Sequence, residues 1–322
     1  MKNRLGLIFV FIVTLSRPVF CQEANYGPGY QTIMIDNPAV AGSRVEGTMR
    51  LSYLNFYPGH NYNFHSVFLS YDSYFPVLHG GAGFYIADDY AGGIMNDLRS
   101  GLSYSYFLQA GKRLFINAGL SASLFHRGFN FTDAVLPDQI NAMGGISIPS
   151  AEILTNENRT VLDVGTGFVA TSGRFIGGFA VNHLAQPDLA GQGSSADRLK
   201  RKYLFHFTAD FDLNKGINLK IRPMATIVIQ GSFISGYAGA LLETNSFAVN
   251  SGFLVNNNNN IDVLSGFSFR KEMLAVFYNY RFNVSSKNSL MPFSLTHQTG
   301  LALSLNKVQK RIKVRTINMP EL

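Results

Sequence analysis

Histidine, serine and acidic side chains are the groups of this chain that could carry hydrolytic or metal chemistry, and their spacing singles out no such site. The seven histidines include neither an HxH nor an HExxH pair, so two metal ligands are not presented on one face of a strand or helix. His65 and Ser66 are adjacent and would point to opposite faces of a strand. Nothing in the spacing singles out His297 with Ser294 or Ser304 as a nucleophile and base. We therefore expect no enzymatic activity, no metal site and no cofactor.

Two glycine clusters could suggest phosphate-binding loops. Gly80-Gly81-x-Gly83 and Gly177-Gly178 lack the Gly-Lys-Ser/Thr ending of such a loop, and no helical pattern follows either cluster. Both lie at the starts or in the interiors of expected strands, where glycine relieves curvature. We therefore interpret them as structural.

The first 21 residues have the three parts of a secretory signal peptide. Lys2 and Arg4 precede an apolar run from Leu5 to Leu15, and a cleavage-like end follows at Cys21. We expect cleavage after Cys21; a lipoprotein cut before Cys21 is the alternative, although Phe20 is bulky for that site. Either route exports the chain, and the first leaves a mature protein without cysteine.

The composition of the chain favours strands over helices. Charged residues make up 15% and aromatic residues 13%, with 31 glycines and no tryptophan, which suits short strands joined by tight turns. Beyond the leader, no stretch reaches the roughly 18 consecutive apolar residues that a membrane helix needs. The formal net charge of +7, part of it in the leader, is too small to indicate a nucleic-acid partner.

Period-two alternation places apolar side chains on one face of several long segments. Tyr203–Leu213, Leu114–Leu124 and Leu274–Phe282 all alternate in this way. Soluble sandwiches alternate too, but their strands average about five to six residues, whereas strands that cross a membrane need about 9 to 11. We therefore predict an all-β fold, an antiparallel transmembrane β-barrel of about 14 strands. The expected strands begin near Gly47, Asn63, His79, Leu98, Lys112, Arg159, Gly173, Lys202, Ile217, Ser232, Asn245, Asn260, Lys271 and Pro292.

Connection lengths alternate along the chain as in outer-membrane barrels, which have short periplasmic turns and long outer loops. With the N-terminus in the periplasm, every even-numbered connection is expected to be short. The odd-numbered ones are expected to be longer, apart from a tight turn at Gly231, and include Asp88–Asp97, His126–Asn158 and Ala185–Arg201. We expect the last two loops to form the outer contact surface, because loops on a rigid scaffold usually carry binding.

Basic residues gather in two places. Arg198–Lys202 lies where a long outer loop re-enters a strand, and we expect a solvated rim there by default, with a contact to lipopolysaccharide or a secreted protein as the alternative. A second cluster follows the last strand, where a frayed terminus and a docking segment for a periplasmic partner are equal alternatives. That cluster consists of Lys307, Lys310, Arg311, Lys313 and Arg315.

The segment Asn37-Pro38-Ala39-Val40-Ala41-Gly42-Ser43 resembles the NPAxAGS signature of the PorP/SprF family of Bacteroidota outer-membrane proteins. Weaker likenesses follow it in order and extend the resemblance over residues 22–322. They are Leu69-Ser70-Tyr71-Asp72 ahead of Pro76, Gly81-x-Gly83, Phe129-Asn130-Phe131-Thr132-Asp133, and Asn182-His183-Leu184-x-Gln186-Pro187-Asp188.

The resemblance implies a non-enzymatic outer-membrane barrel of the type IX secretion and gliding machinery; a porin-like solute channel is the alternative. Expected partners are outer-membrane lipid, a secreted adhesin or effector, and periplasmic peptidoglycan-associated or secretion-system lipoproteins. We expect a signal peptide (residues 1–21), an N-terminal periplasmic segment (22–46), the barrel (47–305) and a basic tail (306–322). The turn-rich composition around Asn37 and Pro38 suggests a periplasmic plug or latch. These two residues and the five basic residues of the tail are the candidate partner-binding set.

Overall fold

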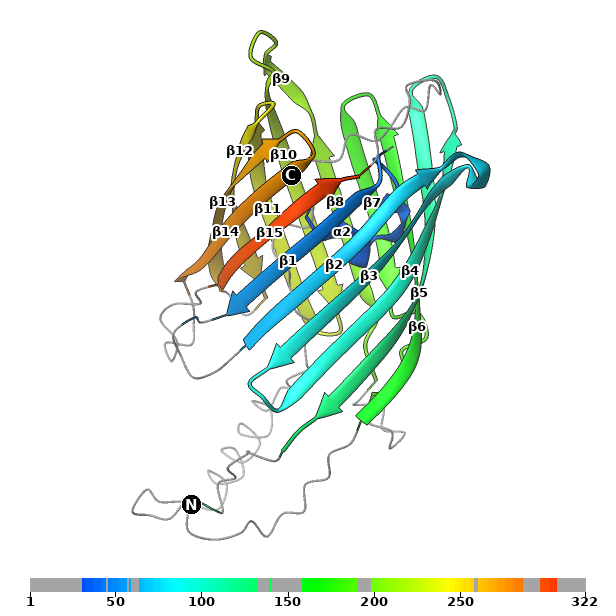
Figure 1. Cartoon of the computed structure of the whole chain (residues 1–322), viewed down its shortest axis with the longest axis vertical. Helices are drawn as coiled ribbons and strands as arrows, with labels where there is room; N and C mark the ends of the chain where they lie inside the picture. Colours follow the sequence, from blue (N-terminus) through cyan, green and yellow to red (C-terminus); the bar gives the residue numbers. More distant parts are fainter. Residues whose placement is uncertain are drawn as a thin grey trace, which may run out of the picture.

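A closed antiparallel barrel is formed by the residues that the structure, a computed structural model, describes: 31–44, 46–56, 58, 64–131, 139, 158–189, 198–257, 260–285 and 296–305. Strands that follow one another in the chain are neighbours in the sheet, and the last strand pairs with the first to close the ring (Figure 1). The strands are β1 (Thr48–Phe56), β2 (Phe64–Phe75), β3 (Gly80–Ala91), β4 (Met95–Gln109), β5 (Leu114–Phe129), β6 (Asn158–Ser172), β7 (Phe175–Asn182), β8 (Lys202–Ala209), β9 (Phe211–Asn214), β10 (Leu219–Gln230), β11 (Phe233–Glu243), β12 (Phe247–Asn256), β13 (Ile261–Lys271), β14 (Leu274–Ser285) and β15 (Thr296–Ser304).

The barrel has 14 strands, because β8 and β9 are two parts of one strand. Both pair with β10, and the gap in pairing at Ala209 and Asp210 lies opposite Pro223 and Arg222 of that strand. Proline has no N–H to donate to the ladder, so pairing is interrupted there. Arg222, whose side chain is buried, forms ion pairs with Asp210 and Glu243 beside the gap.

The predicted fold, strand count and even-numbered short turns are confirmed, and the strand starts differ by a few residues at most, the largest difference being Thr296 where Pro292 was expected. One loop prediction is wrong. β3 and β4 continue through Asp88–Asp97 and are joined by a three-residue turn, Gly92–Ile94. Gly92 and Gly93 adopt positive φ angles of 64° and 82°, which lets the hairpin close tightly.

The outer wall of the barrel is apolar and the inner wall is largely polar. In β4, Leu98, Leu102 and Tyr106 are exposed to the outside, while the residues between them, such as Arg99 and Ser103, are buried in the interior. No helix among the described residues is long and apolar enough to cross a membrane. The apolar outer face is the surface that a transmembrane barrel presents to lipid.

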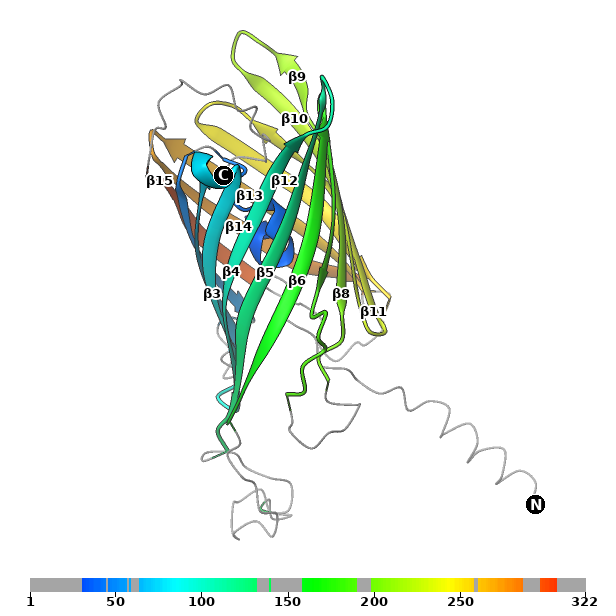
Figure 2. The same cartoon turned by 90° about the vertical axis from the view of Figure 1, so that its right-hand side faces the viewer.

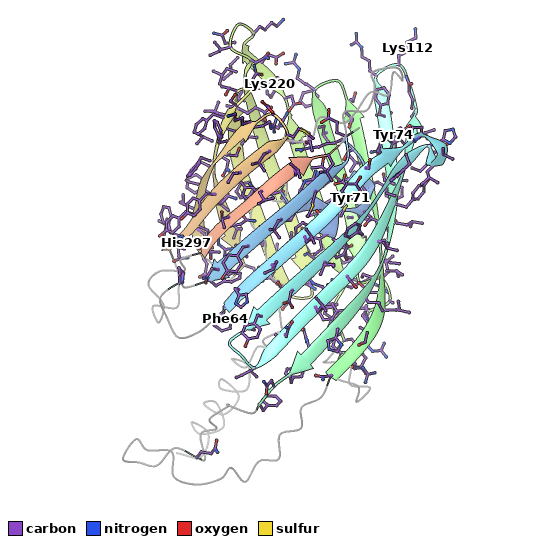
Figure 3. The ribbon with its side chains drawn as sticks, in the orientation of Figure 1. Phe64, Tyr71, Tyr74, Lys112, Lys220 and His297 are labelled. Atoms are coloured by element: carbon purple, nitrogen blue, oxygen red, sulfur yellow. The ribbon has the colours of Figure 1, made fainter. Side chains whose placement is uncertain are left out.

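Aromatic side chains gather towards both ends of the outer wall. At one end, His65 packs between Tyr53 and Tyr90, with ring centroids 5.9 and 5.0 Å away. Towards the other end, Tyr74 stacks on Phe107 at 5.5 Å. Figure 3 shows His297 near one end of the barrel and Tyr74 near the other end. Such belts mark the two membrane interfaces.

We predict that the cost of an outward-facing arginine depends on its depth. Leu102 is 68% exposed in the middle of β4, and Val77 is 89% exposed in the short helix η2 (Pro76–Leu78) between β2 and β3. Leu102→Arg should reduce the free energy of unfolding by about 2–4 kcal/mol and Val77→Arg by about 1 kcal/mol or less, measured by denaturant titration of barrels refolded in lipid vesicles. Equal losses would contradict the membrane placement.

Candidate functional site: the occupied lumen

The N-terminal segment, residues 31–44, lies inside the barrel and crosses its lumen. At one end Asn279 Nδ2, on β14, donates a hydrogen bond to Gln31 Oε1 over 2.6 Å. The middle of the segment, at Pro38 and Ala39, lies against Gly119 of β5. β14 and β5 are six strands apart on the way round through β1, so the segment joins nearly opposite walls. Figure 2 shows the short helix α2 (Ile33–Asp36) within the ring of strands.

The Asn-Pro-Ala sequence forms the turn that follows α2. Asn37 Oδ1 accepts a hydrogen bond from Ala39 N at 3.0 Å, which caps the single turn of 3-10 helix η1 (Pro38–Val40). Pro38 occupies the first position of that turn, where a missing N–H costs nothing. Gly42 has a φ of 65°, which allows the chain to turn towards β1.

Two glycines on neighbouring strands make room for this turn, and we call this pair, Gly119 and Gly167, the seat of the turn. Gly119 of β5 pairs in register with Gly167 of β6. A Cβ on Gly119 would lie 2.2 Å from Ala39 N, and one on Gly167 would lie 2.1 Å from Asn37 Oδ1. A Cβ on Gly81 of β3 would lie 2.0 Å from Ala41 O. Gly81, interpreted from the sequence as relieving curvature, thus permits close approach of the segment to the wall.

Polar contacts fix the segment along the same wall. Ser105 Oγ donates to Ala39 O at 2.8 Å, and Asp72 Oδ2 accepts from Gly42 N at 2.8 Å. Because Asn37 Oδ1 already accepts from Ala39 N, its Nδ2 group is the donor to His206 Nε2 at 3.0 Å. Each such hydrogen bond makes a net contribution of about 1 kcal/mol to stability, so together these bonds hold the segment against the wall.

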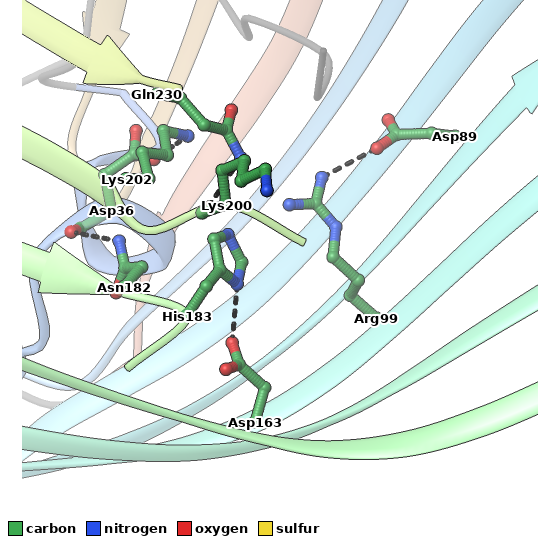
Figure 4. Close-up of polar contacts among 9 residues, drawn as sticks. All are labelled: Asp36, Asp89, Arg99, Asp163, Asn182, His183, Lys200, Lys202 and Gln230. Atoms are coloured by element: carbon green, nitrogen blue, oxygen red, sulfur yellow. Dashed lines mark hydrogen bonds and ion pairs between the residues drawn. The ribbon is translucent and has the colours of Figure 1, made fainter. Parts of the chain in front are cut away.

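The segment is also bound at Asp36, between β7 and β8. Lys202 Nζ lies 2.7 Å from Asp36 Oδ1, and Asn182 Nδ2 donates to Asp36 O at 2.8 Å (Figure 4). Lys202 was expected from sequence at an outer rim. Its side chain is instead mostly buried and faces the N-terminal segment.

Of the candidate partner-binding residues, the structure describes only Asn37 and Pro38. Asn37 and Pro38, expected in a periplasmic plug or latch, are buried in the lumen. The five basic residues of the tail and the leader, residues 1–21, lie outside the described residues. Within the described part of the chain, no group of three or more His, Cys, Asp or Glu side chains could hold a metal ion.

The ends of one long loop fold towards the inner wall near the outer mouth. Leu189 and Leu199, which flank the undescribed residues 190–197, pack on Phe125 of β5 and are buried with it. The Arg99 and Arg127 guanidinium carbons lie 5.9 and 5.6 Å from the centroid of the Phe125 ring.

Those arginines belong to a set of ion pairs on the inner wall. Arg99 pairs with Asp89 at 2.6 Å, and Arg127 pairs with Asp97 at 2.6 Å. Figure 4 shows the first of these pairs, together with His183 Nδ1 at 2.7 Å from Asp163 Oδ2. Opposite charges thus compensate each other within the lumen, as buried charges require.

Fold comparison finds other outer-membrane barrels. The monoaromatic hydrocarbon channel CymD matches with a TM-score of 0.52 and 12% identity, over 89% of this chain and 95% of that chain. The toluene transporter TodX of Pseudomonas putida matches with a TM-score of 0.50 and 10% identity, over 89% of this chain and 98% of that chain. At such low identity these likenesses establish the fold alone. No curated protein matched the chain.

The apolar outer wall, the closed ring and these neighbours define the chain as an outer-membrane β-barrel, and its described N-terminal segment lies in the lumen. The model of the family described as type IX secretion system membrane protein PorP/SprF matches residues 20–300. The chain belongs to that family, as the NPAxAGS resemblance predicted.

Sequence reasoning missed the seat and the Asp36 contacts. Gly119 and Gly167 occur in alternating strands like many other glycines, and only the register of β5 with β6 brings them side by side. Asp36 and Lys202 are far apart in sequence, so no spacing signal could have paired them. The available signal was an inward-facing lysine at the start of a membrane strand, a position where a charge needs a partner.

We predict that adding one methyl group at the seat displaces the N-terminal segment. Gly119→Ala should lower the free energy of unfolding by about 1–3 kcal/mol through overpacking against Ala39 and should make residues 31–44 more accessible to protease. Gly236→Ala is the matched control, because a Cβ on Gly236 meets no atom within 4 Å. Similar behaviour of the two variants would argue against the seat.

Proposed function

We propose that this barrel is a non-enzymatic component of the type IX secretion and gliding machinery that acts by binding proteins at its two rims. The observation that carries the proposal is the position of the N-terminal segment, which spans the lumen from β14 to β5. A barrel whose lumen holds its own chain is suited to docking, whereas an open aqueous pore is suited to solute passage.

The outer contact is proposed for the loops at 126–158 and 185–201, with a secreted adhesin or effector as the partner. Support comes from the ends of the second loop, where Leu189 and Leu199 pack on Phe125. A loop anchored at both ends to a rigid wall presents its middle with less loss of conformational entropy on binding. Binding sites on loops held by a rigid scaffold are common.

The inner contact is proposed for the basic tail, with a periplasmic lipoprotein of the secretion system as the partner. Support comes from the pairing of Thr48 with Ser304, since the first strand begins and the last strand ends at the same rim. That rim carries the short connections, which in outer-membrane barrels face the periplasm. The tail therefore starts on the periplasmic side.

A hydrophobic-solute channel is the second candidate, and an apolar cluster on the inner wall favours it. The inward side chains of Met224, Tyr237, Leu241, Leu254 and Leu264 pack together on β10 to β13. CymD is described as a monoaromatic hydrocarbon channel and TodX as a toluene transporter, which is a property of those proteins. Uptake of a labelled aromatic hydrocarbon by vesicles carrying the purified barrel would favour this candidate.

We predict that the tail recruits the periplasmic partners through its charge. Replacement of Lys307, Lys310, Arg311, Lys313 and Arg315 by Gln should remove secretion-system lipoproteins from the proteins that copurify with the tagged barrel, as measured by mass spectrometry after mild detergent extraction. The control replaces Lys112 and Arg113, which lie in the β4–β5 turn at the same rim, by Gln. This variant should leave copurification unchanged. Normal recovery with the tail variant would count against the inner contact.

A further inference from the structure

Both ends of the outer loop hold the same residue of the N-terminal segment. Asn182 is the last residue of β7 and Lys202 is the first residue of β8, so the connection 183–201 starts and finishes beside them. Asn182 Nδ2 bonds Asp36 O at 2.8 Å, and Lys202 Nζ bonds Asp36 Oδ1 at 2.7 Å. Figure 4 shows the two contacts converging on Asp36 from adjacent strands.

The described loop ends, residues 183–189 and 198–201, are themselves fixed to the barrel. Leu199 N donates to Pro187 O at 3.0 Å, which ties the two ends to each other. Gln230 Nε2 of β10 donates to Lys200 O at 3.3 Å. The His183 contact with Asp163 and the packing of Leu199 on Phe125 attach the same ends to β6 and β5.

We propose that the loop ends and the N-terminal segment form one coupled unit, so that pulling the loop ends away from Phe125 loosens Asp36 and releases the segment from the lumen. The coupling is direct, because the loop begins and ends next to Asn182 and Lys202, the two residues that bind Asp36. Displacement of the loop ends at the outer rim would thus change the position of the N-terminal segment, which leads to β1 at the periplasmic rim. The coupling concerns the barrel itself and does not depend on the identity of any partner.

The chemistry of the Asp36 contacts explains why the two parts would respond together. The Asp36 and Lys202 side chains are 20% and 12% exposed, so most of their hydration is lost in the lumen. Removing one member of such a pair leaves the other charge without its nearest compensation, which is unfavourable. A shift of Lys202 away from Asp36 therefore weakens the hold on the segment.

The test measures how fast a cysteine in the segment reacts with a maleimide in isolated outer membranes. Ser43→Cys is suitable because Ser43 is buried and the exchange is nearly isosteric. The chain without this exchange, whose lone cysteine is Cys21, gives the background. Lys202→Met and Leu199→Ser are each introduced into the Ser43→Cys chain, and folding is checked by heat-modifiable gel mobility; Leu189→Ala replaces Leu199→Ser if that variant does not fold.

We expect each variant to raise the labelling rate about tenfold, as loss of a charge-assisted or fully buried contact would. The two changes combined should raise the rate little beyond the larger single effect, because both release the same unit. Exchanging the charges with Asp36→Lys and Lys202→Asp should restore slow labelling. Arg281→Met, which removes the 2.7 Å lumen pair with Asp262 on β13, should leave the rate unchanged.

Two results would overturn the proposal. One is a folded Leu199→Ser or Leu189→Ala barrel that labels at the rate of the parent, which would mean that the loop ends do not hold the segment. The other is a combined effect equal to the product of the single effects, which would mean that the two sites act independently.

Discussion

The close approach of the N-terminal segment to the Gly119–Gly167 pair is the constraint on which the rest of the lumen depends. Because Gly119 and Gly167 have no side chain on the inner face of β5 and β6, the Asn-Pro-Ala turn can lie against the wall. Ala39 O can then accept from Ser105, and Asn37 Nδ2 can donate to His206. Once the turn is seated, α2 is directed across the lumen, Asp36 reaches Lys202, and Gln31 reaches Asn279. Hydrogen bonds of the strand ladder alone would close the ring but would leave the lumen unfilled.

Many polar side chains of the described inner wall are buried, so they need partners in the protein. The inner wall therefore carries neutralising pairs such as Arg99 with Asp89 and Arg281 with Asp262, and amide contacts such as Asn250 with Asn279. Lipid imposes the opposite requirement on the outer wall, where exposed leucine and phenylalanine are favourable. The strict alternation of the strands satisfies both requirements residue by residue.

The barrel was predictable from the sequence because alternation is a local signal. The outward-facing Tyr203, Phe205 and Phe207 alternate with buried residues, as predicted, up to the break at Asp210. The break itself needed the register of β10, since Pro223 matters only once it is known to lie opposite the gap between β8 and β9. The tight turn at Gly92–Ile94 was missed because Asp88 and Asp89 suggested a polar loop, although Asp89 faces Arg99 inside the barrel.

The candidate site was less accessible to sequence reasoning than the fold. The NPAxAGS signature identified the family and the segment, but it did not reveal where the segment lies. Its seat and its contact with Lys202 join residues more than 70 positions apart, and such pairs depend on strand order and register. The occupied lumen is the observation on which the proposed docking role at the rims rests.

The most direct test of the occupied lumen is cross-linking across it in intact outer membranes. Cysteines introduced as Gln31→Cys and Asn279→Cys should be joined by a short bis-maleimide, because these side chains meet at 2.6 Å inside the barrel. The pair Gln31→Cys and Val276→Cys should not be joined, since Val276 lies on the outward face of the same strand. A folded barrel in which residues 31 and 279 fail to cross-link, or cross-link no better than residues 31 and 276, would contradict the account.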